Sequence, residues 1–179
     1  MTGQTLDELH PPTLWERATS GWRAPALLAA GGILVINAAL FLQFGLGVQP
    51  CVLCVYQRIP YLVVATLGTT ALVFGRRRRV RVALLALSAL ALLIGCAIAV
   101  FHLGIENHWW AGTAGCGVPP PAATVEELRA RLLTGPVVRC DEVSWSLFGI
   151  SLAGYNIPLT LAMATFAISA ARKAARARS

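Results

Sequence analysis

Four apolar stretches dominate this chain of 179 residues, and each is long enough to cross a lipid bilayer as a helix. They run from about Ala24 to Leu46, from about Val55 to Phe74, from Val82 to about Leu103 and from about Leu147 to Ala171. Backbone N–H and C=O groups in hydrocarbon must bond to one another, and a helix meets this need within a single stretch. The chain is therefore predicted to be an all-α membrane protein, a bundle of four transmembrane helices.

The composition agrees with a membrane protein. The chain is 56% hydrophobic and 13% charged, and its polar residues form blocks between the apolar stretches. A soluble domain would mix polar residues into every helix. The net charge of +7 could indicate a nucleic-acid partner. However, the basic residues flank the apolar stretches, and no zinc-finger or RNA-binding signature accompanies them. We therefore expect the lipid bilayer, and no nucleic acid, as a partner.

The basic residues also predict an orientation. Arg76 to Arg79 and Arg81 lie between the second and third stretches, and further basic residues precede the first stretch and follow the last. The opposite side carries only Arg129, Arg131 and Arg139. The positive-inside rule then places both termini in the cytoplasm. The predicted parts are a cytoplasmic tail (1–23), a transmembrane domain (24–171) with outward loops at 47–57 and 104–146, and a basic cytoplasmic tail (172–179).

Five cysteines occur, and four of them lie in the two outward loops: Cys51, Cys54, Cys116 and Cys140. The fifth, Cys96, lies in the middle of the third stretch, where a small apolar side chain suits a contact between helices. In a bacterium the outward compartment would be the oxidising periplasm. Disulfide chemistry is therefore expected in these loops.

Cys51 and Cys54 form a Cys-x-x-Cys pair directly after Pro50, where the second helix is about to begin. A helix N-terminus lowers the pKa of a thiol and makes its thiolate available for exchange. The pair could also supply half of a zinc site, with Cys116 and Cys140 as the other half, or form an inert structural disulfide. The short first loop and the oxidising compartment weigh against zinc, so no metal is expected. Four membrane-spanning helices bury enough surface to be stable without structural disulfides, which weighs against the structural reading.

Arg58 follows Cys54 by four residues, so a helix would place its guanidinium on the same face as that sulfur. A charge within a span costs about 2.5 to 3.5 kcal/mol, which favours a functional role. Arg58 could hold a carbonyl oxygen of a cofactor and stabilise the Cys54 thiolate. Alternatively, it could extend to the outer membrane surface. Pro60 could instead delay the start of the helix, and Arg58 would then not lie one turn from Cys54.

The second outward loop contains a helix signal of its own. Thr124 and Glu127 fit a capping box, and apolar Val125, Leu128 and Leu132 follow at helical spacing. A short amphipathic helix that lies on the membrane surface is therefore predicted between the two loop cysteines. Such a helix could let the cysteine pair move toward another pair, or it could be an ordinary connector.

Several of these motifs resemble the bacterial disulfide bond formation protein B family. The members are membrane oxidases that regenerate a soluble periplasmic dithiol oxidase. The residues that carry the resemblance are Cys51-Val52-Leu53-Cys54-Val55-Tyr56-Gln57-Arg58, then Gly104-Ile105-Glu106 before Cys116, and Cys140 followed by Trp145, Gly149, Ser151 and Asn156. The resemblance covers nearly the whole chain from the first apolar stretch onward.

The resemblance implies four helices around a quinone near the outer surface of the inner membrane. By the same resemblance, Cys51 and Cys54 reduce the quinone, Cys54 forms the contact or adduct with the ring, and Arg58 binds a ring oxygen. A histidine of the quinone site could correspond to His102 or His108, or to neither, and His102 is the residue we select. Ubiquinone is expected rather than menaquinone.

The resemblance also implies an order of electron transfer. Cys116 exchanges with a thiol of a soluble thioredoxin-like partner in the periplasm, and Cys140 relays to Cys51. A partner with a potential of about −120 mV could not be reoxidised by a glutathione pool at about −200 mV, whereas a membrane quinone could accept its electrons. The expected activity is that of a protein-dithiol:quinone oxidoreductase. The alternatives are a thiol-dependent quinone or quinone-epoxide reductase and a non-catalytic membrane scaffold with structural cysteines.

Overall fold

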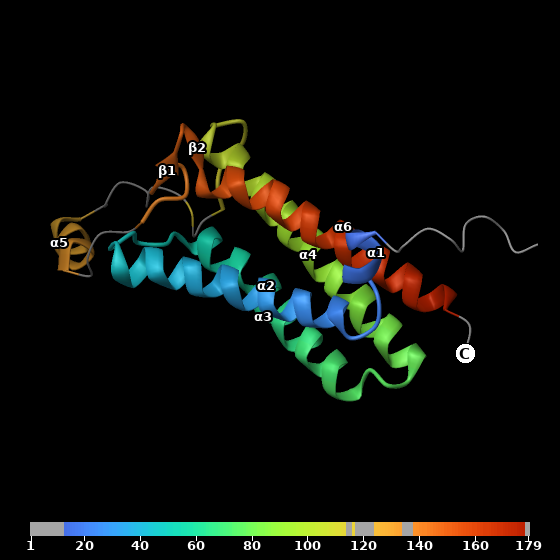
Figure 1. Ribbon diagram of the computed structural model, residues 1–179. Helices are drawn as coiled ribbons and strands as arrows, with labels where there is room; N and C mark the ends of the chain where they lie inside the picture. The colour runs from blue at the N-terminus through green and yellow to red at the C-terminus, as the bar shows by residue number, and fades with distance from the viewer. Residues whose placement is uncertain (1–12, 114–115, 117–123, 134–137, 178–179) are drawn as a thin grey trace, which may run out of the picture.

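The computed structural model describes residues 13–113, 116, 124–133 and 138–177 (Figure 1). Its elements follow one another along the chain in this order: α1 (Leu14–Ala18), α2 (Arg23–Leu40), the π-helix η2 (Phe41–Gly45), α3 (Val52–Phe74), α4 (Arg78–Glu106), α5 (Val125–Leu133), β1 (Ser146–Leu147), β2 (Ile150–Ser151) and α6 (Leu152–Arg176).

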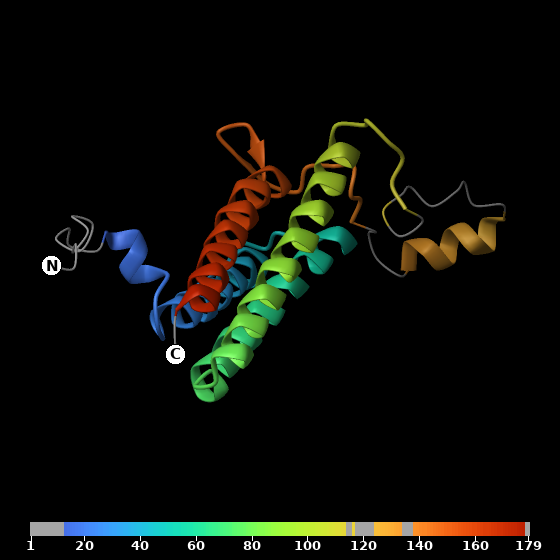
Figure 2. The same cartoon turned by 90° about the vertical axis from the view of Figure 1, so that its right-hand side faces the viewer.

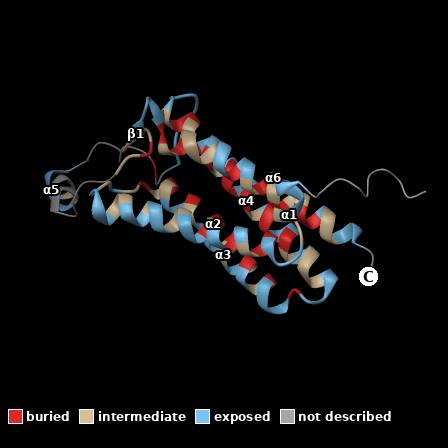
Figure 3. Ribbon diagram, in the orientation of Figure 1, coloured by how far each residue is buried: buried red, intermediate tan, exposed pale blue. Residues whose placement is uncertain are grey.

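Four of these segments are long and apolar enough to cross a membrane: α2 continued by η2, α3, α4 and α6. They form a bundle in which α2 packs on α3, α3 on α4 and α4 on α6 (Figures 1 and 2). Their buried residues face the inside of the bundle, and the outer faces are largely exposed (Figure 3). The prediction of an all-α bundle with four membrane spans is confirmed.

Small residues bring α2 and α3 close together. A Cβ atom on Gly32 of α2 would lie 2.7 Å from the carbonyl oxygen of Tyr61, and a Cβ on Gly68 of α3 would lie 2.8 Å from that of Pro25. Such contacts between backbones are open only to glycine, and they are common where membrane helices associate. The α2–α3 pair is therefore fixed in register by these glycines.

The spans differ at their ends from the sequence prediction. Helix α3 begins at Val52, three residues earlier than expected, and includes Pro60 in its interior. Helix α4 is longer at both ends than the predicted third span. The outward loops expected at 47–57 and 104–146 are both shorter, because the first residues of α3 and the last turn of α4 are helical.

The predicted start of the fourth span at Leu147 is wrong. A hairpin of β1 and β2 precedes α6, with Leu147 paired to Ile150. Phe148 and Gly149, which form the two-residue turn, have φ angles of 50° and 79°. Positive φ at both turn positions matches the twist of a tight hairpin. Ser151 then caps α6 by accepting a hydrogen bond from the Gly154 N–H at 3.1 Å.

The short helix predicted in the second outward loop is present as α5. The Thr124 hydroxyl accepts a hydrogen bond from the Glu127 N–H at 3.2 Å, which is one half of the expected capping box. The side chains of Leu128 and Leu132 lie outside the described part of the structure. In two views at right angles, α5 lies apart from the bundle (Figures 1 and 2).

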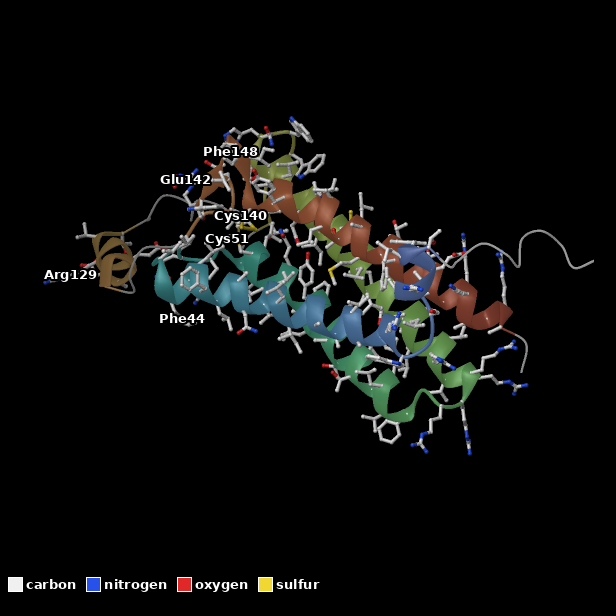
Figure 4. All side chains as sticks on the ribbon, viewed as in Figure 1. Phe44, Cys51, Arg129, Cys140, Glu142 and Phe148 are labelled. Carbon is white, nitrogen blue, oxygen red and sulfur yellow. A yellow bond between two sulfur atoms is a disulfide. The ribbon has the colours of Figure 1, made fainter. Side chains whose placement is uncertain are left out.

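Both expected tails contain helix. Residues 14–18 form α1, whereas residues 1–12 of the N-terminal tail are outside the described part, and α6 continues through Arg176. The Lys173 ammonium donates a hydrogen bond to the carbonyl oxygen of Glu16 at 2.6 Å. Helix α1, the end of α6 and the arginine-rich turn before α4 thus lie at one end of the bundle, and Cys51 and Cys140 lie at the other (Figure 4).

The close packing of α2 on α3 predicts different outcomes for two adjacent glycines. Gly32→Ala should lower the stability of the protein in detergent by about 1 to 3 kcal/mol, because the new methyl group meets backbone atoms of α3. Gly31→Ala meets only the flexible end of Met163 and should be neutral, or stabilising by up to about 1 kcal/mol. Thermal unfolding of both variants in the same detergent provides the measurement. Equal midpoints would contradict the assigned helix contact.

Candidate active site

Cys51 occupies the N-cap of α3. Its backbone is extended, with φ −74° and ψ 172°, and its Sγ accepts a hydrogen bond from the Cys54 N–H at 3.2 Å. The two Sγ atoms are free thiols that lie 2.9 Å apart. An N-cap residue satisfies one of the unpaired N–H groups of the first helical turn, so its side chain is drawn over the helix end. The helix start therefore brings the two thiols together.

The surroundings of Cys51, which lies just outside α3, favour its thiolate. A hydrogen bond from the Cys54 thiol is the largest influence, and together with hydrogen bonds from His102 and the Cys54 N–H it outweighs burial and lowers the pKa of Cys51 to about 4. Cys51 is only 2% exposed. These hydrogen bonds therefore favour the thiolate of this buried cysteine over its thiol.

His102 reaches this thiol from α4. Its Nε2 lies 3.5 Å from the Cys51 Sγ, and its side chain is 3% exposed. Glu106 follows one helical turn later, with Oε1 3.8 Å from the same Nε2, and its other oxygen accepts a hydrogen bond from Ser151. His108 lies beyond the end of α4 with φ 58° and borders a recess near Cys116. Of these two histidines, His102 is the one that lies at the cysteine pair.

A chain of hydrogen-bonded polar side chains continues from His102. Gln57 Nε2 lies 2.8 Å from His102 Nδ1, and Asn156 Nδ2 donates to Gln57 Oε1 at 2.6 Å. The Tyr61 hydroxyl donates to Asn156 Oδ1. No role was predicted from the sequence for Tyr61, Gln57 or Glu106. Polar groups inside apolar spans are costly without partners, and this signal could have identified Gln57 and Tyr61.

A cavity of about 250 Å³ opens beside Cys54. Its apolar walls come mainly from α2 and α6, which pack on α3 and α4 but contact each other little. Polar side chains also line it, among them Cys54, Gln57, Arg58, His102 and Asn156. Apolar walls with a few converging polar groups are typical of a site for a small, largely apolar molecule.

Arg58 lines this cavity on the same helix as Cys54. Its Nη1 donates a hydrogen bond to Gln43 Oε1 at 2.6 Å, and Gln43 lies in the π-helix η2. A π-helix inside a longer helix turns the following side chains to new directions and is frequent at functional sites. The guanidinium is thus held at the cavity by a partner from α2's extension rather than left free to reach the membrane surface.

The other two loop cysteines are joined. Cys116 and Cys140 form a disulfide with a Cα–Cα distance of 4.9 Å, and both are buried in one cluster with Cys51, Leu53 and Ile105. Figure 4 shows Cys140 beside Cys51 at the end of the bundle. This pairing disagrees with a zinc site made of four cysteines, because two of the sulfurs bond to each other. A dithiol and a disulfide therefore meet in one buried cluster.

Comparison with known proteins identifies the family. The profile of the disulfide bond formation protein DsbB family matches residues 22–170. The chain belongs to the DsbB family. Disulfide bond formation protein B of Haemophilus influenzae Rd is 33% identical over 133 residues, which cover 73% of this chain and 75% of that protein. The protein of the same name from Pasteurella multocida is 27% identical over 154 residues, which cover 82% and 85% of the two chains. No solved structure matches.

DsbB family membership gives the general activity. The protein is a disulfide oxidoreductase that acts in disulfide bond formation, and a multi-pass protein of the inner membrane. The cysteine cluster agrees with this activity, because disulfide exchange requires a thiolate that can attack a nearby disulfide.

The lowered pKa of Cys51 predicts a thiolate that persists in mild acid. Because this pKa is depressed, the thiolate is present above pH about 4 and is lost only as the pH falls through that value. An ordinary cysteine loses its thiolate below about 8.5. The ultraviolet absorbance of the thiolate, taken as the difference between the reduced protein and its Cys51→Ser variant, reports the midpoint. A midpoint near that of an ordinary cysteine would contradict the assigned hydrogen bonds.

Proposed function

We propose that the protein is a protein-dithiol:quinone oxidoreductase, which reoxidises a soluble thioredoxin-like dithiol oxidase of the periplasm and passes the electrons to membrane quinone. One observation carries the proposal. The free dithiol borders an apolar cavity through Cys54, and on its other side Cys51 packs in one cluster with the Cys116–Cys140 disulfide. A relay of electrons from a protein thiol to a membrane acceptor needs both a disulfide to exchange with and a site for the acceptor.

The cavity fits a quinone better than a polar acceptor. Side chains such as Ile36, Leu42 and Leu159 can surround an apolar ring and its chain, and Arg58 can donate to a ring oxygen. A quinone supplies a two-electron acceptor when it is bound. Ubiquinone is proposed over menaquinone.

The proposed exchanges balance. A thiolate of the partner attacks Cys116 and releases Cys140 as a thiolate, and the second partner thiol completes the partner's disulfide. The two electrons pass from Cys140 to the Cys51–Cys54 pair by a further exchange. Oxidation of that pair, a Cys51 thiolate and a Cys54 thiol, to a disulfide would release two electrons and one proton. With a second proton from the solvent, these would convert a quinone to hydroquinone. The described arrangement, with one disulfide and one free dithiol, corresponds to the stage before quinone reduction.

The proposal includes an orientation with both termini in the cytoplasm. The arginines between α3 and α4 and the basic end of α6 lie at the end of the bundle opposite the cysteines. The positive-inside rule favours placing that basic end in the cytoplasm. The cysteine cluster then faces the periplasm, where a soluble dithiol protein can reach it.

The deciding experiment is anaerobic mixing of the purified protein with ubiquinone-1 and a reduced periplasmic dithiol oxidase. Quinone absorbance should fall as the dithiol is consumed in equal amount. Cys51→Ser and Cys54→Ser should each abolish this reaction while the protein stays folded in the membrane. Cys96→Ser is the matched control, since Cys96 lies in α4 and is not among the residues that line the cavity, and it should retain full activity. A scaffold with structural cysteines would leave the quinone unchanged in every sample.

Arg58→Ala should raise the KM for quinone and slow its reduction. A charge-assisted hydrogen bond to a ring oxygen strengthens as that oxygen gains negative charge. Such a bond contributes about 1.5 to 3 kcal/mol, so kcat/KM should fall by roughly tenfold to hundredfold. Arg23→Ala, at the opposite end of the bundle, is the control and should leave the kinetics unchanged. Unaltered KM and kcat in Arg58→Ala would place the quinone elsewhere.

A further inference from the structure

The polar chain that ends at His102 has a direction. An amide side chain has a donor end and an acceptor end, so one fixed bond orients the next. The Tyr61 hydroxyl donates to the oxygen of Asn156, which turns the Asn156 amino group toward the oxygen of Gln57. The Gln57 amino group is then the group that faces His102 Nδ1 at 2.8 Å.

This direction fixes where the imidazole carries its proton. A ring nitrogen that accepts a hydrogen bond bears no proton, so a neutral His102 with Nδ1 accepting from Gln57 must hold its proton on Nε2. The Nε2–H lies on the side of the Cys51 Sγ, 3.5 Å away. The opposite tautomer would present a lone pair to the Cys51 thiolate and could not stabilise it.

We propose that Tyr61, Asn156 and Gln57 are positioning residues that set the tautomer of His102, so that its Nε2–H faces the Cys51 sulfur. The proposal rests on the proposed function only for the use of Cys51 as a redox thiol, and the tautomer can be measured without any quinone. The three residues belong to α3 and α6, whereas His102 belongs to α4. These hydrogen bonds therefore make the position of the imidazole proton of His102 depend on how the three helices pack.

Two other groups, Cys54 and Glu106, also act on Cys51 or on the Nε2 side of His102. Cys54 faces Cys51 from α3, and Glu106 lies on the Nε2 side of His102 at 3.8 Å, where a carboxylate would also favour the Nε2–H form. Gln57, in contrast, acts on the Nδ1 side. Changes at Gln57 and at Glu106 can therefore be compared, because they alter opposite edges of the same ring.

The direct test is ¹⁵N NMR of the reduced, detergent-solubilised protein labelled at histidine. The chain has three histidines, and loss of one signal set in His102→Gln assigns His102. The native protein should show a protonated Nε2 and a bare Nδ1. Gln57→Leu and Asn156→Leu should shift the ratio of the two tautomers toward Nδ1–H by about fivefold or more, as expected for the loss of one hydrogen bond.

Gln57→Glu tests the direction of the hydrogen bond between residue 57 and Nδ1 of His102. A carboxylate can only accept, so Gln57→Glu should shift the ratio toward Nδ1–H further than Gln57→Leu does, whereas a role in packing alone predicts equal ratios in the two variants. Asn37→Leu is the matched control: Asn37 donates a hydrogen bond to the carbonyl oxygen of Ile33 on its own helix, and its removal should leave the His102 signals unchanged. Glu106→Gln should keep Nδ1 bare.

Three results would overturn the proposal: Nδ1–H in the native protein, an unchanged ratio in Gln57→Leu and Asn156→Leu, or an equal response to Asn37→Leu. If one of Gln57→Leu, Gln57→Glu and Asn156→Leu fails to fold in detergent, the other two still test whether the network sets the tautomer of His102. Failure of quinone reduction with the predicted tautomers intact would count against the proposed function and leave the positioning role standing.

Discussion

The hydrogen bonds around His102 connect polar side chains of membrane-spanning helices, where a polar group left without a partner is costly. Each bond joins two helices: Gln57 and Tyr61 come from α3, His102 from α4 and Asn156 from α6. The positions of these three helices thus influence the protonation of the Cys51 thiol. This coupling explains why a reactive site in a small bundle can be kept in one geometry.

Helix α2 has a different task in the bundle. Glycine contacts hold it against α3, and it meets α6 only slightly. The space left between α2 and α6 is the cavity beside Cys54, and η2 turns Gln43 from the end of α2 onto Arg58. Tight packing on one side of α2 therefore leaves an open site on the other.

The sequence predicted several elements because their signals are local. Apolar length alone identified the four spans, and Thr124 with Glu127 identified α5. The position of Cys51 at a helix start followed from Pro50 and the apolar residues after Cys54. The hairpin before α6 was missed, although Gly149 after Phe148 is a turn signal, because the apolar residues on both sides of the turn extend the pattern of the span.

By itself, the sequence determined that the chain crosses a membrane, how many times it does so, and that Cys51 and Cys54 share a helix start, since each of these depends on neighbouring residues. Only the tertiary structure decided that His102 and not His108 meets Cys51, and that Asn156 reaches Gln57 across 99 positions of the chain. Hydrophobic periodicity specifies which face of a helix is buried but not which side chain stands opposite. That choice depends on the register between helices, which close packing sets.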